Sequence, residues 1–291
     1  MKIAMVGLGK MGANMTERLR GFGHDVVGYD RDPDKADVAS LPEAVAALDG
    51  QARRVVWVMV PAGAPTTSTI AELAGLLSEG DLVVDGGNSN FRDSQRDAEL
   101  LADRGIGFID AGVSGGVWGL VAGYCIMAGG SAADIDHLRP VFDALVTDGG
   151  FAHVGPVGAG HFTKMVHNGV EYALMQAYAE GYELLGAAEL DIDVAATLAV
   201  WRHGSVVRSW LLDLLAAGLE ADPGLASVSG YAEDSGEGRW TVQEAIDLAV
   251  PVPAIAAALF ARFTSRQDDS PAMRAIATLR NQFGGHATRP S

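Results

Sequence analysis

Three glycines near the start of the chain place the strongest constraint on its fold. The stretch GLGKMG supplies Gly7, Gly9 and Gly12, directly after the apolar run 2–6 and directly before the helical pattern of 13–23. At this spacing the first glycine permits a tight turn, the second lets a ligand approach the backbone, and the third lets the helix pack closely on the strand. This context predicts a dinucleotide-binding unit.

An acidic residue follows at the distance expected for such a unit. The next apolar run ends at Asp30, about twenty residues beyond the glycines, where a carboxylate can accept hydrogen bonds from a ribose 2′-hydroxyl. Because that carboxylate would repel a 2′-phosphate, the predicted cofactor is NAD. The adjacent Arg31 could offset part of the repulsion, so NADP remains a possible second cofactor.

The pattern of apolar runs changes about halfway along the chain. Runs at 2–6, 25–30, 53–60, 81–87 and 106–112 are separated by helix-length spacers, with helices expected from about Thr66 and about Asp93. Such runs read as parallel strands buried on both faces. Long Ala- and Leu-rich segments follow. We predict a Rossmann-type doubly wound α/β domain over 1–157 and an all-α substrate and oligomerisation domain with a C-terminal tail over 158–291.

Charge and cysteine content exclude several classes of protein. The formal net charge of −16 disfavours nucleic-acid binding. One cysteine, Cys125, rules out an internal disulfide and fits a cytoplasmic location. The uncharged stretch 111–133 is broken by glycines, so we expect a loop-rich part of the site and no membrane span. Without His, Asp or Glu at metal-ligand spacing, no metal cofactor is expected.

A polar stripe interrupts an apolar helical segment in the second half. Lys164, His167, Asn168 and Glu171 fall at i, i+3, i+4 and i+7, which places them on one helix face. Neighbouring apolar side chains are expected to pack around the stripe in the interior: Met165, Val166, Val170, Tyr172, Leu174 and Met175. A partly dehydrated lysine is a usable base for a hydroxyl proton. The glutamate could then move a proton at a neighbouring carbon, although a structural Lys–Glu pair between helices is the alternative.

Seven strings spread over the chain resemble the 6-phosphogluconate dehydrogenase family, in its short NAD-linked branch. The string KMVHNG-x-EY is specific to that family, whereas the glycine motif is shared with all β-hydroxyacid dehydrogenases. The strings are GLGKMGANM (7–15), DGGNS (85–89), GVSGGVWG (112–119), GAGHFTKMVHNGVEY (158–172), GRWT (238–241), ALFAR (258–262) and LRNQFGGH (279–286).

The resemblance implies a reaction of the pentose phosphate pathway. 6-Phosphogluconate is oxidised at its 3-hydroxyl by hydride transfer to nicotinamide, loses CO₂, and is protonated to ribulose 5-phosphate. Lys164 matches the general base and later acid, and Glu171 matches the acid that protonates the enediol. Matching substrate contacts are Asn88, Ser114, Gly115, Gly116, His167, Asn168 and Tyr172. Matching cofactor contacts are Gly7, Leu8, Gly9, Met11, Gly12, Asp30, Arg31, Val60 and Asn88.

The phosphate end of the substrate matches Arg262, Arg280 and His286. In relatives the tail that bears the last two reaches the neighbouring subunit's site, which implies a homodimer or homotetramer. Long family members also hold the phosphate with a lysine and a threonine, and Ser235 and Glu237 occupy the aligned positions here. One positive charge is therefore missing.

Two other functions stay open. A β-hydroxyacid dehydrogenase acting on a small or non-phosphorylated sugar acid would keep Lys164 but would have no use for Arg262, Arg280 and His286. A non-catalytic dinucleotide-binding protein would not need Lys164 and Glu171 together.

Overall fold

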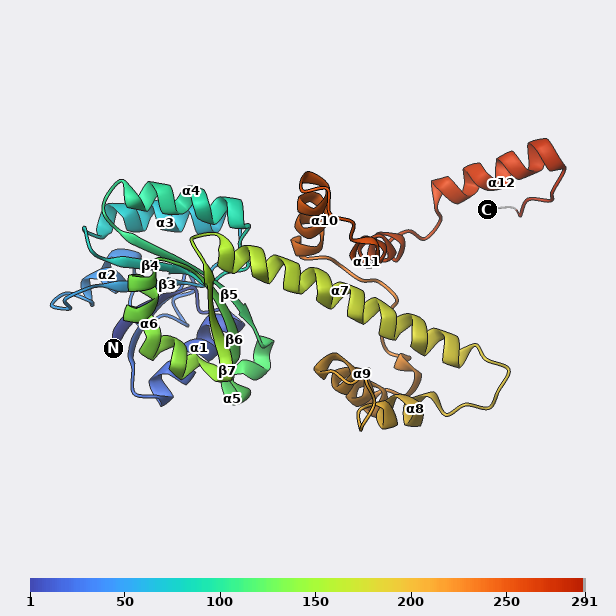
Figure 1. The fold of residues 1–291 in the computed structure, drawn as a ribbon, viewed down its shortest axis with the longest axis horizontal. Coiled ribbons are helices and arrows are strands. Elements are labelled where there is room, and N and C mark those ends of the chain that lie inside the picture. The colour runs from blue at the N-terminus through green and yellow to red at the C-terminus, as the bar shows by residue number, and fades with distance from the viewer. Residues whose placement is uncertain (290–291) are drawn as a thin grey trace. The chain divides into compact units, whose positions relative to one another are not determined.

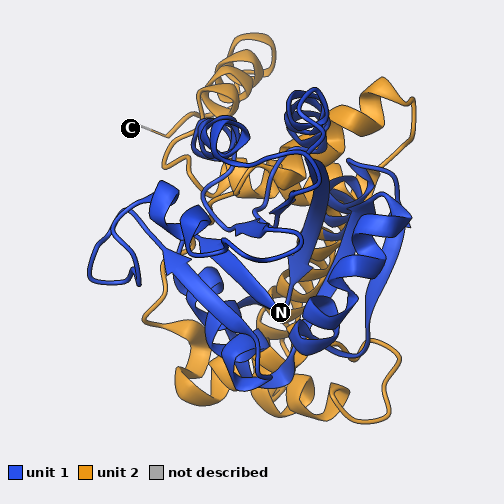
Figure 2. Cartoon of the chain, turned by 90° about the vertical axis from the view of Figure 1, so that its left-hand side faces the viewer, with its two compact units in different colours: residues 1–167 blue, residues 168–291 orange. Residues whose placement is uncertain are grey.

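The computed structural model describes residues 1–289, which form two compact units, 1–167 and 168–289 (Figure 2). The division falls within one long helix, α7 (Ala159–Gly186). The boundary expected at 157/158 lies just before that helix. The two units differ in kind, because the first is built on a sheet and the second is helical (Figure 1).

The first unit contains a seven-stranded sheet in the order β2-β1-β3-β4-β5-β6-β7. Its strands are β1 (Lys2–Val6), β2 (Asp25–Tyr29), β3 (Val55–Val58), β4 (Leu82–Asp85), β5 (Gly107–Ser114), β6 (Tyr124–Gly130) and β7 (Val146–Gly155). Its helices before α7 are α1 (Lys10–Gly21), α2 (Leu41–Ala46), α3 (Ala64–Leu76), α4 (Phe91–Ala102), η1 (Gly116–Trp118), α5 (Gly119–Ala122) and α6 (Ala132–Leu145).

Both faces of the sheet carry a buried apolar layer. Side chains alternate along each strand, so Ile3 and Met5 join a cluster with Leu19 of α1 and Leu138 of α6. Ala4 and Val6, whose side chains point to the opposite face of the sheet, join a second cluster with residues of α2, α3 and α4. Helices thus cover the two faces of the sheet, and the predicted doubly wound Rossmann-type fold is confirmed.

The stretch 111–133 is more ordered than expected. It completes β5 and adds η1, α5 and β6, so the prediction of a loop-rich region is wrong for much of its length. β6 is antiparallel to β5, while the other strand pairs are parallel. The many glycines suggested loops, but several of them stand where another backbone approaches closely, as at Gly129 beside Gly160.

Local capping explains where two expected helices begin. α3 begins at Ala64 with a proline in its first turn, and α4 begins at Phe91 because the Asn90 side chain accepts a hydrogen bond from the N–H of Arg92. Both starts lie two residues before the expected ones at Thr66 and Asp93.

The second unit is all-α, as predicted, and has little core of its own. After α7 come α8 (Val194–Trp201), α9 (Trp210–Ala221), η2 (Pro223–Leu225), α10 (Glu237–Asp247), α11 (Pro253–Thr264) and α12 (Pro271–Gly284). Its two small clusters centre on Tyr172 with Leu259 and on Leu198 with Leu212. Within residues 1–289, no helix has the length and apolar character needed to span a membrane.

Candidate active site

The glycine loop between β1 and α1 has the shape that its sequence predicts. Gly7 has φ +96°, and a Cβ added there would lie 2.7 Å from the carbonyl oxygen of Met59. A Cβ at Gly12 would lie 1.9 Å from the carbonyl oxygen of Gly7, whereas one at Gly9 would meet nothing within 4 Å. Close backbone packing therefore requires two of these glycines, and the third leaves open space before α1.

The beginning of α1 fits an anionic pyrophosphate. Gly9 is the N-cap, no acidic residue lies in the first turn, and no side chain caps the helix. Its first N–H groups and the helix dipole are therefore available to an anion. A cavity of about 480 Å³ opens beside the loop. The expected cofactor contacts that line it are Gly7, Gly9, Met11, Gly12, Asp30, Arg31 and Val60.

The carboxylate of Asp30 is fixed at the end of β2. Its Oδ2 accepts a hydrogen bond from the N–H of Leu8 at 2.6 Å, and its Oδ1 accepts one from the N–H of Asp32 at 2.9 Å. The acid is thus tied to the glycine loop, while the neighbouring Arg31 is exposed. A ribose placed against the loop would meet the carboxylate first.

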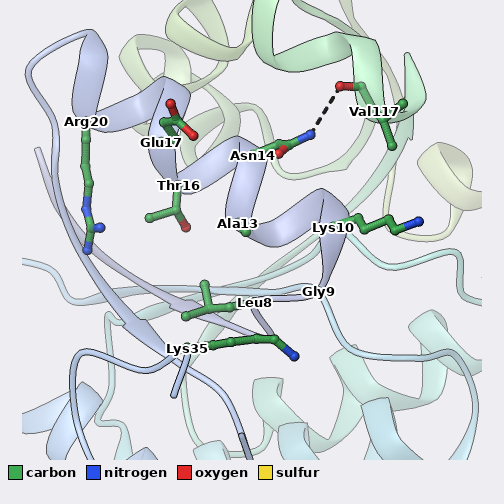
Figure 3. A pocket seen from close by; sticks show the side chains of 10 residues that line it. All are labelled: Leu8, Gly9, Lys10, Ala13, Asn14, Thr16, Glu17, Arg20, Lys35 and Val117. Carbon is green, nitrogen blue, oxygen red and sulfur yellow. Dashed lines mark hydrogen bonds between the residues drawn. The ribbon is translucent and has the colours of Figure 1, made fainter. Parts of the chain in front are cut away.

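A second cavity of about 800 Å³ runs along α1 (Figure 3). One helix face lines it with Ala13, Thr16, Glu17 and Arg20, and the expected cofactor contact Leu8 also borders it. Gly9 and Lys10 border both cavities. The first turn of α1 can therefore be approached from two sides.

Three of the expected catalytic and substrate residues meet within the sheet unit. Lys164 is 8% exposed, and its Nζ lies 3.5 Å from Nδ1 of His167. Nε2 of that histidine lies 3.4 Å from the hydroxyl of Ser114, at the end of β5. Gly115 and Gly116 follow with φ of +128° and +52°. The expected contact Asn88 is exposed on the loop after β4.

The rest of the polar stripe continues along α7. Asn168 is buried and Glu171 is half-buried. Because α7 is continuous from Ala159 to Gly186, the spacing of the stripe places all four polar residues on one helix face. A lysine and a glutamate are therefore about two turns apart along one helix.

The apolar surround expected for this stripe is only partly present. Met165 and Tyr172 are buried, but Val166, Val170 and Leu174 are 37%, 47% and 42% exposed. For these three residues the prediction of an interior position is wrong. They recur every four residues, at about 200°, 240° and 280° around the helix from Lys164, so the row begins opposite the lysine and winds toward the His167 side of the stripe.

A second cluster lies within the helical unit around Tyr172. Its hydroxyl accepts a hydrogen bond from the N–H of Ser235 at 3.2 Å, and the guanidinium carbon of Arg262 lies 3.5 Å from its ring centre. The hydroxyl of Ser235 donates to Oε2 of Glu237 at 2.5 Å, and this glutamate is 2% exposed. The cluster therefore combines a cation with a buried carboxylate.

The other two expected phosphate contacts lie elsewhere on the helical unit. Arg280 is on α12 and His286 follows it, and both are exposed. α12 itself has no buried residue and is drawn apart from α10 and α11 in Figure 1. The three residues expected to hold the phosphate are therefore divided between α11 and the segment from α12 onward.

Two buried polar residues near Lys164 were not singled out from the sequence. Asp110 is fully buried and His161 is 1% exposed. The aspartate was detectable as a charged residue inside the apolar run 106–112. Within residues 1–289, the His, Cys, Asp and Glu side chains form no group of three or more that could hold a metal ion.

Models of two protein families match the chain. Residues 2–155 match the NAD binding domain of 6-phosphogluconate dehydrogenase, and residues 160–286 match the 6-phosphogluconate dehydrogenase C-terminal domain. The two matches meet close to the beginning of α7.

One relative in sequence and two solved structures are similar to the chain over most of its length. The NAD(+)-dependent, decarboxylating 6-phosphogluconate dehydrogenase of Haloferax volcanii is 42% identical over 98% of both chains. The structure of Plasmodium falciparum 6-phosphogluconate dehydrogenase matches 100% of this chain and 67% of its own chain, at a TM-score of 0.82 and 25% identity. A 3-hydroxyisobutyrate dehydrogenase from Mycobacterium tuberculosis has a TM-score of 0.71 and 26% identity, covering 96% of this chain and 99% of its own. With both halves matched, the chain belongs to the 6-phosphogluconate dehydrogenase family of oxidoreductases.

Proposed function

We propose that the protein is a decarboxylating 6-phosphogluconate dehydrogenase that prefers NAD and yields ribulose 5-phosphate and CO₂. The observation that carries this proposal is the buried Lys164, within 3.5 Å of His167, which in turn lies 3.4 Å from Ser114. It supports the proposal because a dehydrated amine beside hydroxyl and imidazole groups suits proton transfer from a sugar hydroxyl. The named activity of the Haloferax volcanii relative supports the same reaction.

In the proposed reaction Lys164 takes the proton from the 3-hydroxyl of the substrate. The residues of the glycine loop and Asp30 would hold the nicotinamide dinucleotide, which would supply the hydride acceptor for the same carbon. The protonated lysine then donates a hydrogen bond to the new ketone oxygen, which stabilises negative charge there as the carboxylate leaves as CO₂. Glu171 delivers a proton to the former C2 carbon of the enediol, now the terminal one. Ser114, His167 and Asn168 are suited to hold the substrate's carboxylate and hydroxyls.

The preference for NAD rests on Asp30. Its carboxylate is held toward the glycine loop by the N–H of Leu8, where it can accept a hydrogen bond from a 2′-hydroxyl and repel a 2′-phosphate. Arg31, exposed beside it, supports some activity with NADP.

The phosphate site is proposed to form between subunits of a cytoplasmic homodimer or homotetramer. Arg262 comes from one chain, and Arg280 and His286 come from the tail of a second copy. The apolar side chains Met273, Ile276, Leu279 and Phe283 on α12 are 57%, 48%, 62% and 79% exposed, which favours a partner that covers them. Sedimentation of a strictly monomeric, fully active enzyme would contradict this arrangement.

One observation favours a second candidate, a β-hydroxyacid dehydrogenase for a small or non-phosphorylated sugar acid. Glu237 is buried in the Tyr172–Arg262 cluster, where a carboxylate would oppose a phosphate dianion. The Mycobacterium tuberculosis neighbour is named for such a substrate, 3-hydroxyisobutyrate.

Steady-state kcat/KM values decide between the candidates. They are measured for 6-phosphogluconate and gluconate, each with NAD and NADP, while CO₂ release is monitored. We expect the highest value for 6-phosphogluconate with NAD, with one CO₂ per NADH and no loss of rate after exhaustive chelation. A higher value for gluconate supports the second candidate, and a rate that returns only with Mg²⁺ or Mn²⁺ refutes the metal-free mechanism.

A further inference from the structure

The carboxylate of Asp110 lies at the beginning of α7 and is fully buried. Its Oδ1 accepts a hydrogen bond from the N–H of Gly158 at 2.7 Å, and its Oδ2 accepts one from the N–H of His161 at 2.7 Å. The helix begins at Ala159, so these are N–H groups at its first turn, which have no partner within the helix. The carboxylate of Asp110, which belongs to β5 and not to α7, therefore caps the beginning of that helix.

The same face of β5 continues along the helix. Residues 110, 112 and 114 point to one side of a strand. A Cβ added to Gly112 would lie 2.4 Å from Cβ of Lys164, and the hydroxyl of Ser114 lies 3.4 Å from His167. One strand thus follows α7 from its first turn to the lysine and then to the histidine.

Close packing fixes the distance between α7 and the sheet. A Cβ at Gly129, which pairs with Asp110 across β5 and β6, would lie 2.5 Å from Oδ1 of that aspartate. A Cβ at Gly160 would lie 2.2 Å from the aspartate's carbonyl oxygen. Steric contact stops α7 from moving inward, and the two hydrogen bonds stop it from moving outward.

The histidine of the first turn adds a second attachment. Nδ1 of His161 lies 2.7 Å from the hydroxyl of Ser94 on α4, and the rings of Phe162 and Phe91 meet edge to face at 5.2 Å. Burial raises the pKa of Asp110, while the His161 ring and the N–H donors act in the opposite direction. Burial outweighs these donors, so the pKa of Asp110 lies above the usual value of an aspartate.

We propose that Asp110 is a positioning residue, whose carboxylate holds the first turn of α7 against β5 and so sets the place of the Lys164 amine. This inference rests on the proposed function, because the position of Lys164 matters for turnover only if that residue is the base. The effect on α7 itself is measurable without turnover.

The test is Asp110→Asn in the full-length protein, which keeps the size of the side chain but turns an NH₂ group toward one of the two N–H donors. We expect kcat with 6-phosphogluconate and NAD to fall by about 10- to 100-fold, as for a small misplacement of a reacting group. The Kd for NAD should stay within about twofold, because residues of the glycine loop are untouched. Hydrogen–deuterium exchange in 156–167 should become faster.

Asp81→Asn is the matched control. Asp81 is also buried and also accepts hydrogen bonds from two backbone N–H groups, those of Arg54 at 3.0 Å and Ser78 at 2.8 Å, but not from α7. It should lose stability while keeping kcat within about twofold. If Asp110→Asn also keeps kcat in this range, the positioning role is wrong.

Two further measurements keep the inference testable. If the unaltered protein turns over none of the sugar acids, the proposed function fails. Separately, if hydrogen–deuterium exchange in 156–167 is the same in Asp110→Asn as in the unaltered protein, the positioning of α7 by Asp110 is wrong. If Asp110→Asn does not fold, Gly112→Ala replaces it, because its methyl group would press on Lys164 while Asp110 stays in place. A normal kcat in that variant would mean that turnover does not depend on the place of Lys164 against β5, which would also overturn the proposal.

Discussion

The sheet unit and the helical unit differ in how much apolar surface each buries. The sheet unit has two extensive layers in which Trp57, Leu82 and Phe142 are fully buried. The helical unit has two small clusters, and large side chains such as Val206 and Phe283 are 100% and 79% exposed. One unit is thus complete in a single chain, whereas the other presents apolar surface typical of a subunit interface.

The same difference applies to the two halves of the site. The cofactor cradle consists of neighbouring loops at strand ends, and its contacts are already in place around Gly7 and Asp30. The proposed phosphate donors are divided between Arg262 in a folded cluster and Arg280 on a helix with no buried residue. Cofactor binding should therefore depend on one chain, and substrate binding on more than one.

The largest expected effect separates cofactor binding from chemistry. Lys164→Ala should lower kcat by about 10²- to 10⁴-fold, because the general base is lost. The Kd for NAD, measured by fluorescence titration, should be unchanged. Glu171→Gln should also lower kcat strongly, whereas Lys2→Ala, a matched lysine on β1, should keep it within about twofold. A near-normal rate for Lys164→Ala would disprove its role as the base.

A chain ending at Asp269 tests whether the uncovered helix serves a second copy. Loss of the two proposed phosphate donors Arg280 and His286 should lower kcat/KM for 6-phosphogluconate by about 10²-fold or more, at about 1.5–3 kcal/mol per donor. The sedimentation coefficient should also fall, while NAD binding persists. Arg280→Ala should reduce activity without changing assembly. Unchanged sedimentation of the shortened chain would remove the argument for a partner.

Two leucine substitutions compare the two units directly. Leu82→Ala, at a side chain with 0% exposure, should lower the free energy of unfolding by about 2–5 kcal/mol at any protein concentration. Leu279→Ala, at 62% exposure, should have an effect below about 0.5 kcal/mol in dilute solution and a larger one at concentrations where subunits associate. Denaturant unfolding at two protein concentrations measures both. Equal losses at all concentrations would contradict the comparison.

A pH-dependent effect is expected at a buried acid within the stable sheet unit. Burial, with the nearby Asp85, raises the pKa of Asp97 to about 6. The folded state therefore keeps this proton between about pH 4 and 6, so stability falls as the pH rises through that window. Asp97→Asn should raise the free energy of unfolding by about 1–3 kcal/mol at pH 8 and by almost nothing at pH 4.

Asp81→Asn provides the opposite sign. Burial raises the pKa of Asp81, but hydrogen bonds from Arg54 and the N–H of Ser78 outweigh it and lower the pKa overall. Its contribution to stability is therefore present above about pH 4, and the substitution should destabilise the protein at pH 8. Unfolding curves at pH 8 and pH 4 measure the change in the free energy of unfolding for each variant. If that change has the same sign for both variants, the pKa assignments are wrong.

The sequence predicted most of the sheet unit because its signals are local. Strand, turn and helix around Gly7 are adjacent in the chain, and Asp30 follows the next strand directly. The polar stripe from Lys164 to Glu171 was equally readable, since helical spacing alone places it on one face. The exposure of Val166 and Leu174 was not readable, because it depends on which other segments cover that side of α7.

Long-range contacts limited the rest of the prediction. β6 was mistaken for loop because its glycines accommodate a helix more than thirty residues further along the chain, as at Gly129 and Gly160. Asp110 gave a local signal, a charge within an apolar strand, but its partners at Gly158 and His161 could not be inferred from spacing. The tertiary fold alone reveals such a cap.

The course of α7 has a consequence for how this protein could be divided or recombined. The helix spans 28 residues, about 42 Å at 1.5 Å per residue, and the two compact units part between His167 and Asn168 in its interior. A chimera joined at that peptide bond would combine two halves of one helix, whereas domains are normally joined by a flexible linker. Exchange of substrate-recognition modules between relatives would therefore succeed only with crossover points before Ala159 or beyond Gly186.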